Sequence, residues 1–192
     1  MTYTPYADLW RPAVRRHALA YDAALILAGS LSIALSAQLA FRLPFTPVPI
    51  TGQTLAVLLT GALLGSRRGA LAALAYLGEG LGGLPVFASG GGGLAHLTGP
   101  TGGYLGGFVL AALVTGFLAE RGWDRRVGTT LLAMLLGNIV IYVPGLLWLS
   151  AFAGPDKTLG MGLYPFILGD LLKIACAAAL LPLGWKLVRI KK

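Results

Sequence analysis

The chain has 192 residues, of which 56% are hydrophobic and only 11% are charged, and its formal net charge is +8 at pH 7. Soluble domains carry about 25% charged residues, so this composition excludes a disordered chain and argues against a soluble globule. The 28 glycines follow no Gly-X-Y period, which excludes collagen. One cysteine, Cys176, excludes an internal disulfide. The remaining class is a polytopic membrane protein.

Six apolar segments follow one another, at about 19–41, 51–64, 69–81, 100–119, 127–149 and 162–185. Four of them have about the 20 residues that a spanning helix needs, whereas the second and third are short and are joined by the polar turn 65–69. We expect two short helices there, with neighbouring loops completing the crossing. The segments lack the alternation of a β-barrel. We therefore predict an all-α integral membrane protein with six transmembrane helices.

The positive charges predict the orientation of these helices. If the N-terminus is cytoplasmic, twelve Lys and Arg residues fall on the inside and only Arg42 and Lys157 fall on the outside. The N- and C-termini are then both inside, and the net charge needs no nucleic-acid partner. We predict a single membrane domain, 1–192, with a cytoplasmic segment 1–18, a bundle 19–187 and a basic cytoplasmic tail 188–192.

Two predicted outside loops differ from ordinary solvated linkers. Loop one, 43–50, contains three prolines, which favour a stiff, extended, nonhelical chain. Loop three, about 82–99, is apolar and carries a glycine run at 90–93. We expect both loops to be ordered and interpret loop three as a lid over a site, with a plain connector as the alternative.

Asp170 and Lys173 lie within the sixth apolar segment. A helix starting near Gly162 would place them about 12–17 Å below its outer end, on one face. Charges at such depth are costly and face the protein interior or a wet cavity. We favour a ligand site reached from outside over a structural pair that neutralises itself.

Other residues are expected near the same outer level. Glu79 lies near the outer end of the third segment and Gln53 opens the second, so four polar side chains would converge on one pocket. Aromatic residues on that side, Tyr104 among them, could stack on a ring. The first segment has a stripe of small residues at spacing four, which lets another helix approach closely, within the chain or from a partner: Ala20, Ala24 and Ala28.

Several chemistries are absent from the sequence. It contains no G-x-x-x-x-G-K-[ST] motif for ATP and no H-E-x-x-H or Cys/His cluster for a metal, so we predict no catalytic residue and no metal ligand. An integral membrane enzyme that uses Asp170 and Glu79 as acid and base remains the alternative from another class.

Five ordered strings resemble one known family. They are PVPITGQT at 47–54, GLPVFA at 83–88, the glycine run, GPTGGY at 99–104 and GDLLK at 169–173. Together they resemble the BioY family, the biotin-specific substrate-binding (S) components of energy-coupling-factor (ECF) transporters.

The resemblance implies capture of biotin from outside, in the bacterial cytoplasmic membrane, by a multi-pass chain that is not an enzyme and needs no cofactor. It implies a membrane-embedded coupling protein (the T component) and two ABC-type ATPases as partners. The stripe Ala20, Ala24 and Ala28 would face the coupling protein. An S component for another small vitamin is the alternative.

Roles for the site residues follow from the resemblance and from the chemistry of biotin. Asp170 would accept a ureido N–H, Lys173 would donate to the ureido oxygen, and Glu79 would accept the second N–H. Gln53 and backbone N–H groups of the glycine run, such as that of Gly91, would meet the carboxylate.

Overall fold

Long apolar helices account for most of the computed structural model, which describes residues 4–190. The main helices are α1 (Arg15–Gln38), α2 (Gln53–Leu64), α3 (Ser66–Leu81), α5 (Gly102–Ala119), α6 (Val127–Ala153) and α8 (Ile167–Ile190). Two shorter helices and four 3-10 turns connect them: α4 (Leu94–Leu97), α7 (Pro155–Gly162), η1 (Tyr6–Trp10), η2 (Ala88–Gly90), η3 (Trp123–Arg125) and η4 (Tyr164–Phe166).

Four stretches are long and apolar enough to cross a membrane. They are α1, α5, α6 and the stretch Pro155–Val188, which contains α7 and most of α8. The chain is therefore an all-helical protein with several candidate membrane spans. The helices α2 and α3 have only 12 and 16 residues and follow one another directly at Gly65.

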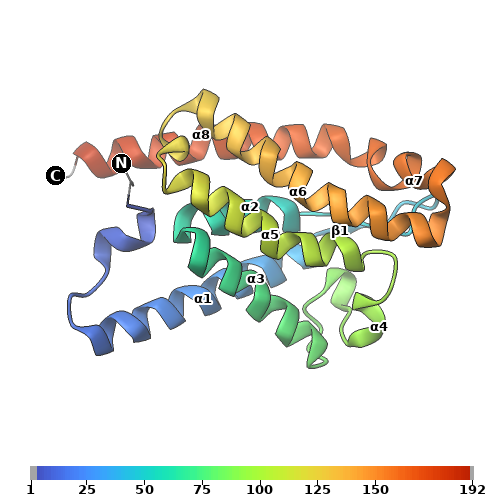
Figure 1. The fold of residues 1–192 in the computed structure, drawn as a ribbon, viewed down its shortest axis with the longest axis horizontal. Helices are drawn as coiled ribbons and strands as arrows, with labels where there is room; N and C mark the ends of the chain where they lie inside the picture. The colour runs from blue at the N-terminus through green and yellow to red at the C-terminus, as the bar shows by residue number, and fades with distance from the viewer. Residues whose placement is uncertain (1–3, 191–192) are drawn as a thin grey trace.

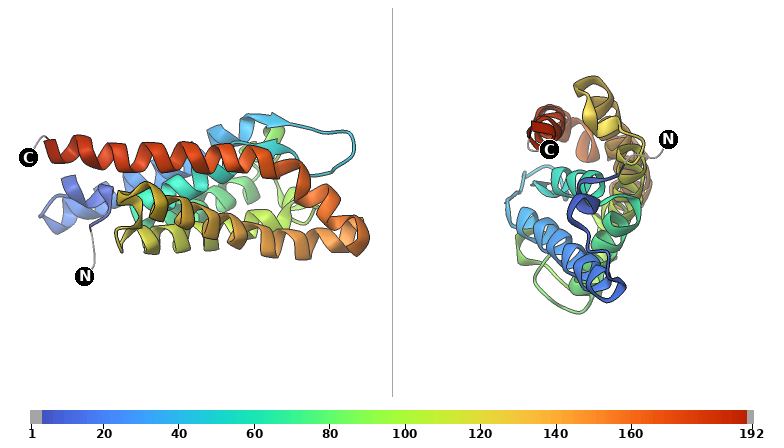
Figure 2. Two further views of the ribbon diagram at one scale, coloured as in Figure 1. Left: turned by 90° about the horizontal axis from the view of Figure 1, so that it is seen from above. Right: turned by 90° about the vertical axis from the view of Figure 1, so that its left-hand side faces the viewer.

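The helices run along the long axis of the molecule, and both termini lie at one end (Figure 1). The connection between α5 and α6 lies at this same end, whereas α4 and α7 lie at the opposite end, together with the loop that carries the strands (Figures 1 and 2). We call these the terminal end and the loop end. The chain thus gathers its longest irregular segments at one end of the bundle.

Small residues let the helices α2, α3 and α5 pack closely. A Cβ added at Gly61 would lie 2.3 Å from Thr115 Oγ1 and 2.4 Å from the carbonyl oxygen of Ala112. A Cβ added at Gly69 of α3 would lie 2.7 Å from the Cα of Gly61. These backbones touch without intervening side chains, which is how membrane helices gain van der Waals contact.

Loop one is bounded by a two-stranded ladder that the sequence did not predict. Strand β1 (Ala40–Phe41) pairs antiparallel with β2 (Ile50–Thr51). The prolines between them remove backbone donors and prevent a helix, so the chain reverses as an extended loop. The hydroxyl of Thr46 donates to the carbonyl oxygen of Met161 at 2.7 Å and ties the loop to α7.

The prediction for the sixth segment is wrong in one respect, because the helix that carries Asp170 does not start near Gly162. The helix α7 ends at Gly162, the chain bends through η4, and α8 begins at Ile167. Pro165 disfavours the α conformation at the residue before it, which ends the preceding helix. Asp170 therefore lies only about 4.5 Å along α8 from its start, and Lys173 about 9 Å.

Of the predicted segment 1–18, residues 1–3 lie outside the described part of the chain, and residues 4–18 are partly helical and contact the bundle. Arg68 of α3 pairs with Asp8 at 2.7 Å and with Asp22 at 2.8 Å, and Arg11 pairs with Asp22 at 2.7 Å. The hydroxyl of Tyr6 donates to the carbonyl oxygen of Leu181 at 2.8 Å. Of the predicted basic tail 188–192, the residues 191–192 lie outside the described part of the chain.

Candidate ligand-binding site

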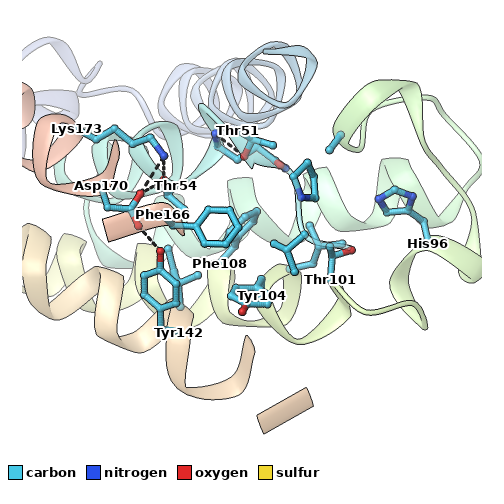
Figure 3. A pocket seen from close by; sticks show the side chains of 16 residues that line it. Thr51, Thr54, His96, Thr101, Tyr104, Phe108, Tyr142, Phe166, Asp170 and Lys173 are labelled. Atoms are coloured by element: carbon cyan, nitrogen blue, oxygen red, sulfur yellow. Dashed lines mark hydrogen bonds and ion pairs between the residues drawn. The ribbon is translucent and has the colours of Figure 1, made fainter. Parts of the chain in front are cut away.

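A cavity opens at the loop end, between loop one, loop three and the helices α2, α5, α6 and α8. It encloses about 600 Å³ of space free of protein atoms, including its open mouth. Its walls are mostly apolar and aromatic, with a few polar side chains (Figure 3). This combination is typical of sites for small molecules.

Four polar side chains form one cluster on its wall. Lys173 Nζ lies 2.9 Å from Asp170 Oδ1 and 2.9 Å from Thr54 Oγ1. The hydroxyl of Thr54 also lies 3.3 Å from Asp170 Oδ1, and the hydroxyl of Tyr142 donates to Asp170 Oδ2. Figure 3 shows these contacts as dashed lines converging on the carboxylate. Residues from α2, α6 and α8 are thereby joined at one point.

Asp170 lies in the first turn of α8, where the helix offers a favourable environment for an acidic side chain. Free backbone N–H groups at a helix N-terminus carry a partial positive charge that stabilises an anion. The residue is only 5% exposed, and a buried charge needs partners. Lys173, three residues later, lies on the same face and supplies the opposite charge.

The cluster leaves hydrogen-bonding capacity unused. A carboxylate has about four lone-pair sites, and the described residues offer Asp170 three donors. An ammonium has three N–H groups, and Lys173 uses two of them, on Asp170 and Thr54. One acceptor position and one donor therefore remain unused among the described residues, on two side chains that line the cavity.

Aromatic rings form the walls next to this cluster. Tyr104 and Tyr142 meet edge to face, with ring centroids 6.1 Å apart. The hydroxyl of Tyr104 donates to the carbonyl oxygen of Gly162 at 2.9 Å, so Tyr104 offers the cavity its ring rather than its hydroxyl. Phe108 and Phe166 complete the apolar lining around it (Figure 3).

Of the six residues predicted for substrate binding, four line the cavity: Asp170, Lys173, Gln53 and Tyr104. Gln53 is 4% exposed, and its Nε2 donates to the hydroxyl of Tyr76 at 2.6 Å. Its Oε1 has no partner among the described residues and is available to a ligand.

Glu79 and Gly91 are not part of the lining. Glu79 accepts a hydrogen bond from the hydroxyl of Ser30 at 2.7 Å, between α3 and α1. It shares no cavity with Asp170, which removes the geometric basis for an acid and base pair made of the two. Gly91 accepts a backbone hydrogen bond from Phe87 at 2.9 Å.

Sequence reasoning missed Thr54 and Tyr142 as members of the cluster. Both had a local signal. Thr54 ends the string PVPITGQT, directly after Gln53. Tyr142 is a hydroxyl-bearing residue within an apolar helix, where a phenol needs a hydrogen-bond partner.

Loop three lines part of the cavity and is anchored by one aromatic ring. Phe87 is fully buried, meets Tyr76 edge to face at 5.5 Å, and fills the space that a Cβ at Gly80 would need. Gly90 N–H donates to the side-chain oxygen of Gln38 on α1 at 3.1 Å. Through Ala88 and other residues, the loop supplies part of the cavity wall.

Two further features bear on function. The predicted stripe of small residues lies on the exposed face of α1: Ala20, Ala24 and Ala28. Among residues 4–190, no group of three or more His, Cys, Asp or Glu side chains could hold a metal ion.

Comparisons with known proteins agree with one another. The sequence model of the BioY family matches residues 11–190. The biotin transporter BioY of Rhizobium etli is 41% identical over 162 residues, which span 80% of this chain and 87% of that protein. The biotin transporter BioY of Rhodobacter capsulatus is 44% identical over 163 residues, which span 74% of this chain and 85% of that protein. The biotin transporter BioY of Thermotoga maritima is 37% identical over 169 residues, which span 88% of this chain and 98% of that protein.

One solved structure is similar over nearly the whole chain. It is the crystal structure of the S-component for biotin from an ECF-type ABC transporter. The TM-score is 0.78 at 27% sequence identity, and the match covers 91% of this chain and 95% of that one.

Proposed function

The chain belongs to the BioY family, and we propose that it captures biotin from outside the cell as the S component of an ECF-type ABC transporter. The relatives are named biotin transporters, so biotin is cargo here and neither a cofactor nor a substrate to be converted. The polypeptide is a binding and transport subunit, not an enzyme.

The observation that carries this proposal is the unused hydrogen-bonding capacity of the cluster. A cyclic urea presents an N–H donor next to a carbonyl acceptor. The free acceptor position of Asp170 and the free N–H of Lys173 are the complement of that pair. Leaving either group unpaired in a closed site costs about 1–3 kcal/mol, which favours a ligand that satisfies both.

The rest of biotin fits the remaining lining. The side-chain oxygen of Gln53 is an available acceptor for the second ureido N–H, a role the sequence assigned to Glu79. The thioether ring would lie against Tyr104, Phe108 and Phe166, because sulfur makes favourable contacts with aromatic rings.

The membrane arrangement that goes with this function has six segments with both termini in the cytoplasm. Residues 1–192 then form one membrane domain in the bacterial cytoplasmic membrane, with loops one and three outside. The terminal end, which carries Arg67, Arg68 and Arg121, would face the cytoplasm, as positive charges favour.

Transport then needs an energy source from other chains, since this one has no ATP-binding motif. We propose that a T component and two ABC-type ATPases supply it. The exposed stripe on α1 is the surface offered to the T component, because small residues allow close helix approach: Ala20, Ala24 and Ala28.

Equilibrium binding of radiolabelled biotin to the detergent-purified chain tests the proposal. One biotin should bind per chain, should be recovered unchanged, and should not be displaced by thiamine, which lacks a cyclic urea. Absence of saturable binding, or conversion of the bound ligand, would refute the function. ATP-dependent uptake into vesicles, with and without the T component and ATPases, tests the partners.

A further inference from the structure

A second hollow lies directly at the mouth of the biotin cavity. It comprises about 810 Å³ of space, part of it open to the outside, and shares four lining residues with the cavity: Pro49, Ala88, His96 and Thr101. The two spaces therefore adjoin. A ligand held at Asp170 can extend from the inner cavity into this outer hollow.

The outer hollow is electropositive. Arg42 lines it, and no Asp or Glu is among its described lining residues. Glu79, which the sequence placed at the outer level, does not line the hollow and accepts a hydrogen bond from Ser30. A guanidinium without a neighbouring carboxylate can bind the carboxylate of a ligand, because two of its N–H groups can donate to the two oxygens at once.

The backbone holds Arg42 at this place. It directly follows the ladder in which Ala40 pairs with Thr51 and Phe41 pairs with Ile50. The same ladder leads through β2 into α2, which carries Gln53 and Thr54 of the inner site. The ladder thus joins Arg42 to the segment that carries Gln53 and Thr54.

His96 lies between the two spaces and lines both. Its ring stacks on Phe87 with centroids 5.2 Å apart, and a Cβ at Gly91 would lie 2.5 Å from it. Glycine at position 91 therefore makes room for the imidazole. Partial burial and, secondarily, the charge of Arg42 lower the pKa of His96, which keeps the ring neutral with one N–H to donate.

We propose that Arg42 and His96 form a carboxylate subsite, which binds the acid group of the ligand whose cyclic urea occupies Asp170 and Lys173. Figure 3 shows His96 at one side of the cavity and the Asp170 cluster at the other, as an elongated ligand with polar ends requires. This inference rests on the proposed function and adds residues that distinguish the acid from its neutral derivatives.

The test compares the binding of biotin and of biotinamide, in which the carboxylate is replaced by an uncharged amide. We expect Arg42→Gln to weaken biotin binding about five- to tenfold and to leave biotinamide binding unchanged. His96→Phe, which keeps a stacking ring without the N–H, should also weaken biotin selectively. The matched control is Lys157→Gln, another predicted outside cation, which is exposed on α7 and should change neither affinity.

The outcomes separate this inference from the proposed function. If Arg42→Gln weakens both ligands equally, or weakens neither, the carboxylate subsite is refuted while biotin binding stands. Asp170→Asn should weaken both ligands, since it alters the urea end that they share. If the wild-type chain binds neither ligand, the proposed function fails and the subsite fails with it.

Discussion

Replacing Asp170 by asparagine tests the site most directly, because it removes one negative charge without changing the shape of the side chain. The carboxylate is 5% exposed and has three protein donors, which leaves one lone pair for a ligand N–H. The amide keeps one oxygen but turns an NH2 group toward donors that need an acceptor. It also leaves the Lys173 ammonium without its counter-charge.

The expected loss follows from these contacts. A hydrogen bond to a charged group contributes about 1.5–3 kcal/mol, so the biotin dissociation constant should rise about 10- to 150-fold. The rise in the dissociation constant for Lys173→Ala should fall in the same range, because this variant lacks the proposed donor to the ureido oxygen and leaves Asp170 without its counter-charge.

Equilibrium binding of radiolabelled biotin to the purified variants measures this loss. Asp156→Asn on α7 is the matched control, since that carboxylate is exposed and does not line the cavity, and its affinity should equal that of the wild type. Melting temperatures without ligand show whether each variant is folded. A folded Asp170→Asn variant that binds biotin within twofold of the wild type would refute our assignment of the site.

Three further predictions concern stability, measured as melting temperature in one detergent. Gly61→Ala should lower the melting temperature, with a loss of stability of about 1–3 kcal/mol, since its Cβ would lie 2.3 Å from Thr115 Oγ1. Gly106→Ala on α5 should raise the melting temperature, with a gain in stability of about 0.5–1 kcal/mol, because no atom apart from the adjacent backbone of its own helix lies within 4 Å of that Cβ. Burial raises the pKa of the Asp124 carboxyl, which is 2% exposed at the terminal end and has an unpartnered Oδ1. The unfolded chain ionises at lower pH than the folded one, so the wild type should lose stability as pH rises from about 4 toward the raised pKa. The variant Asp124→Asn should abolish that loss, and its side-chain oxygen can still accept the hydrogen bond from Trp185. Equal melting temperatures for the two glycine variants, or an unchanged pH profile in Asp124→Asn, would contradict these arguments.

The all-helical class of fold and the Asp170–Lys173 pair that lines the candidate site could be predicted from the sequence for one physical reason. Charges are so costly among apolar residues that Asp170 and Lys173 stand out in a hydrophobic segment, and their spacing of three puts them on one helix face. The start of their helix was not readable, because hydropathy stays high across Pro155–Val188. The break there comes from the backbone sterics of Pro165, which hydropathy does not report.

The position of Glu79 shows a second limit of sequence reasoning. Its place in the third segment gives its depth but not the direction in which the helix turns it. Packing of α3 against α1 directs it to Ser30, whereas Gln53 at a similar level faces the cavity. Such rotations depend on which small residues let helices touch, as Gly61 and Gly69 do for α2 and α3, and a single sequence does not specify those pairings.

The remaining alternative for Asp170 and Lys173 is a structural pair that only neutralises itself. A buried ion pair gives little net stability, and well-packed apolar residues of similar size often do as well or better. A purely structural pair would therefore use its hydrogen-bonding groups on each other and on the surrounding chain. Here the described residues leave one acceptor position and one N–H unused, on the wall of a cavity with aromatic sides and an open mouth. A ligand with adjacent N–H and carbonyl groups would complete this arrangement, which the described residues alone do not.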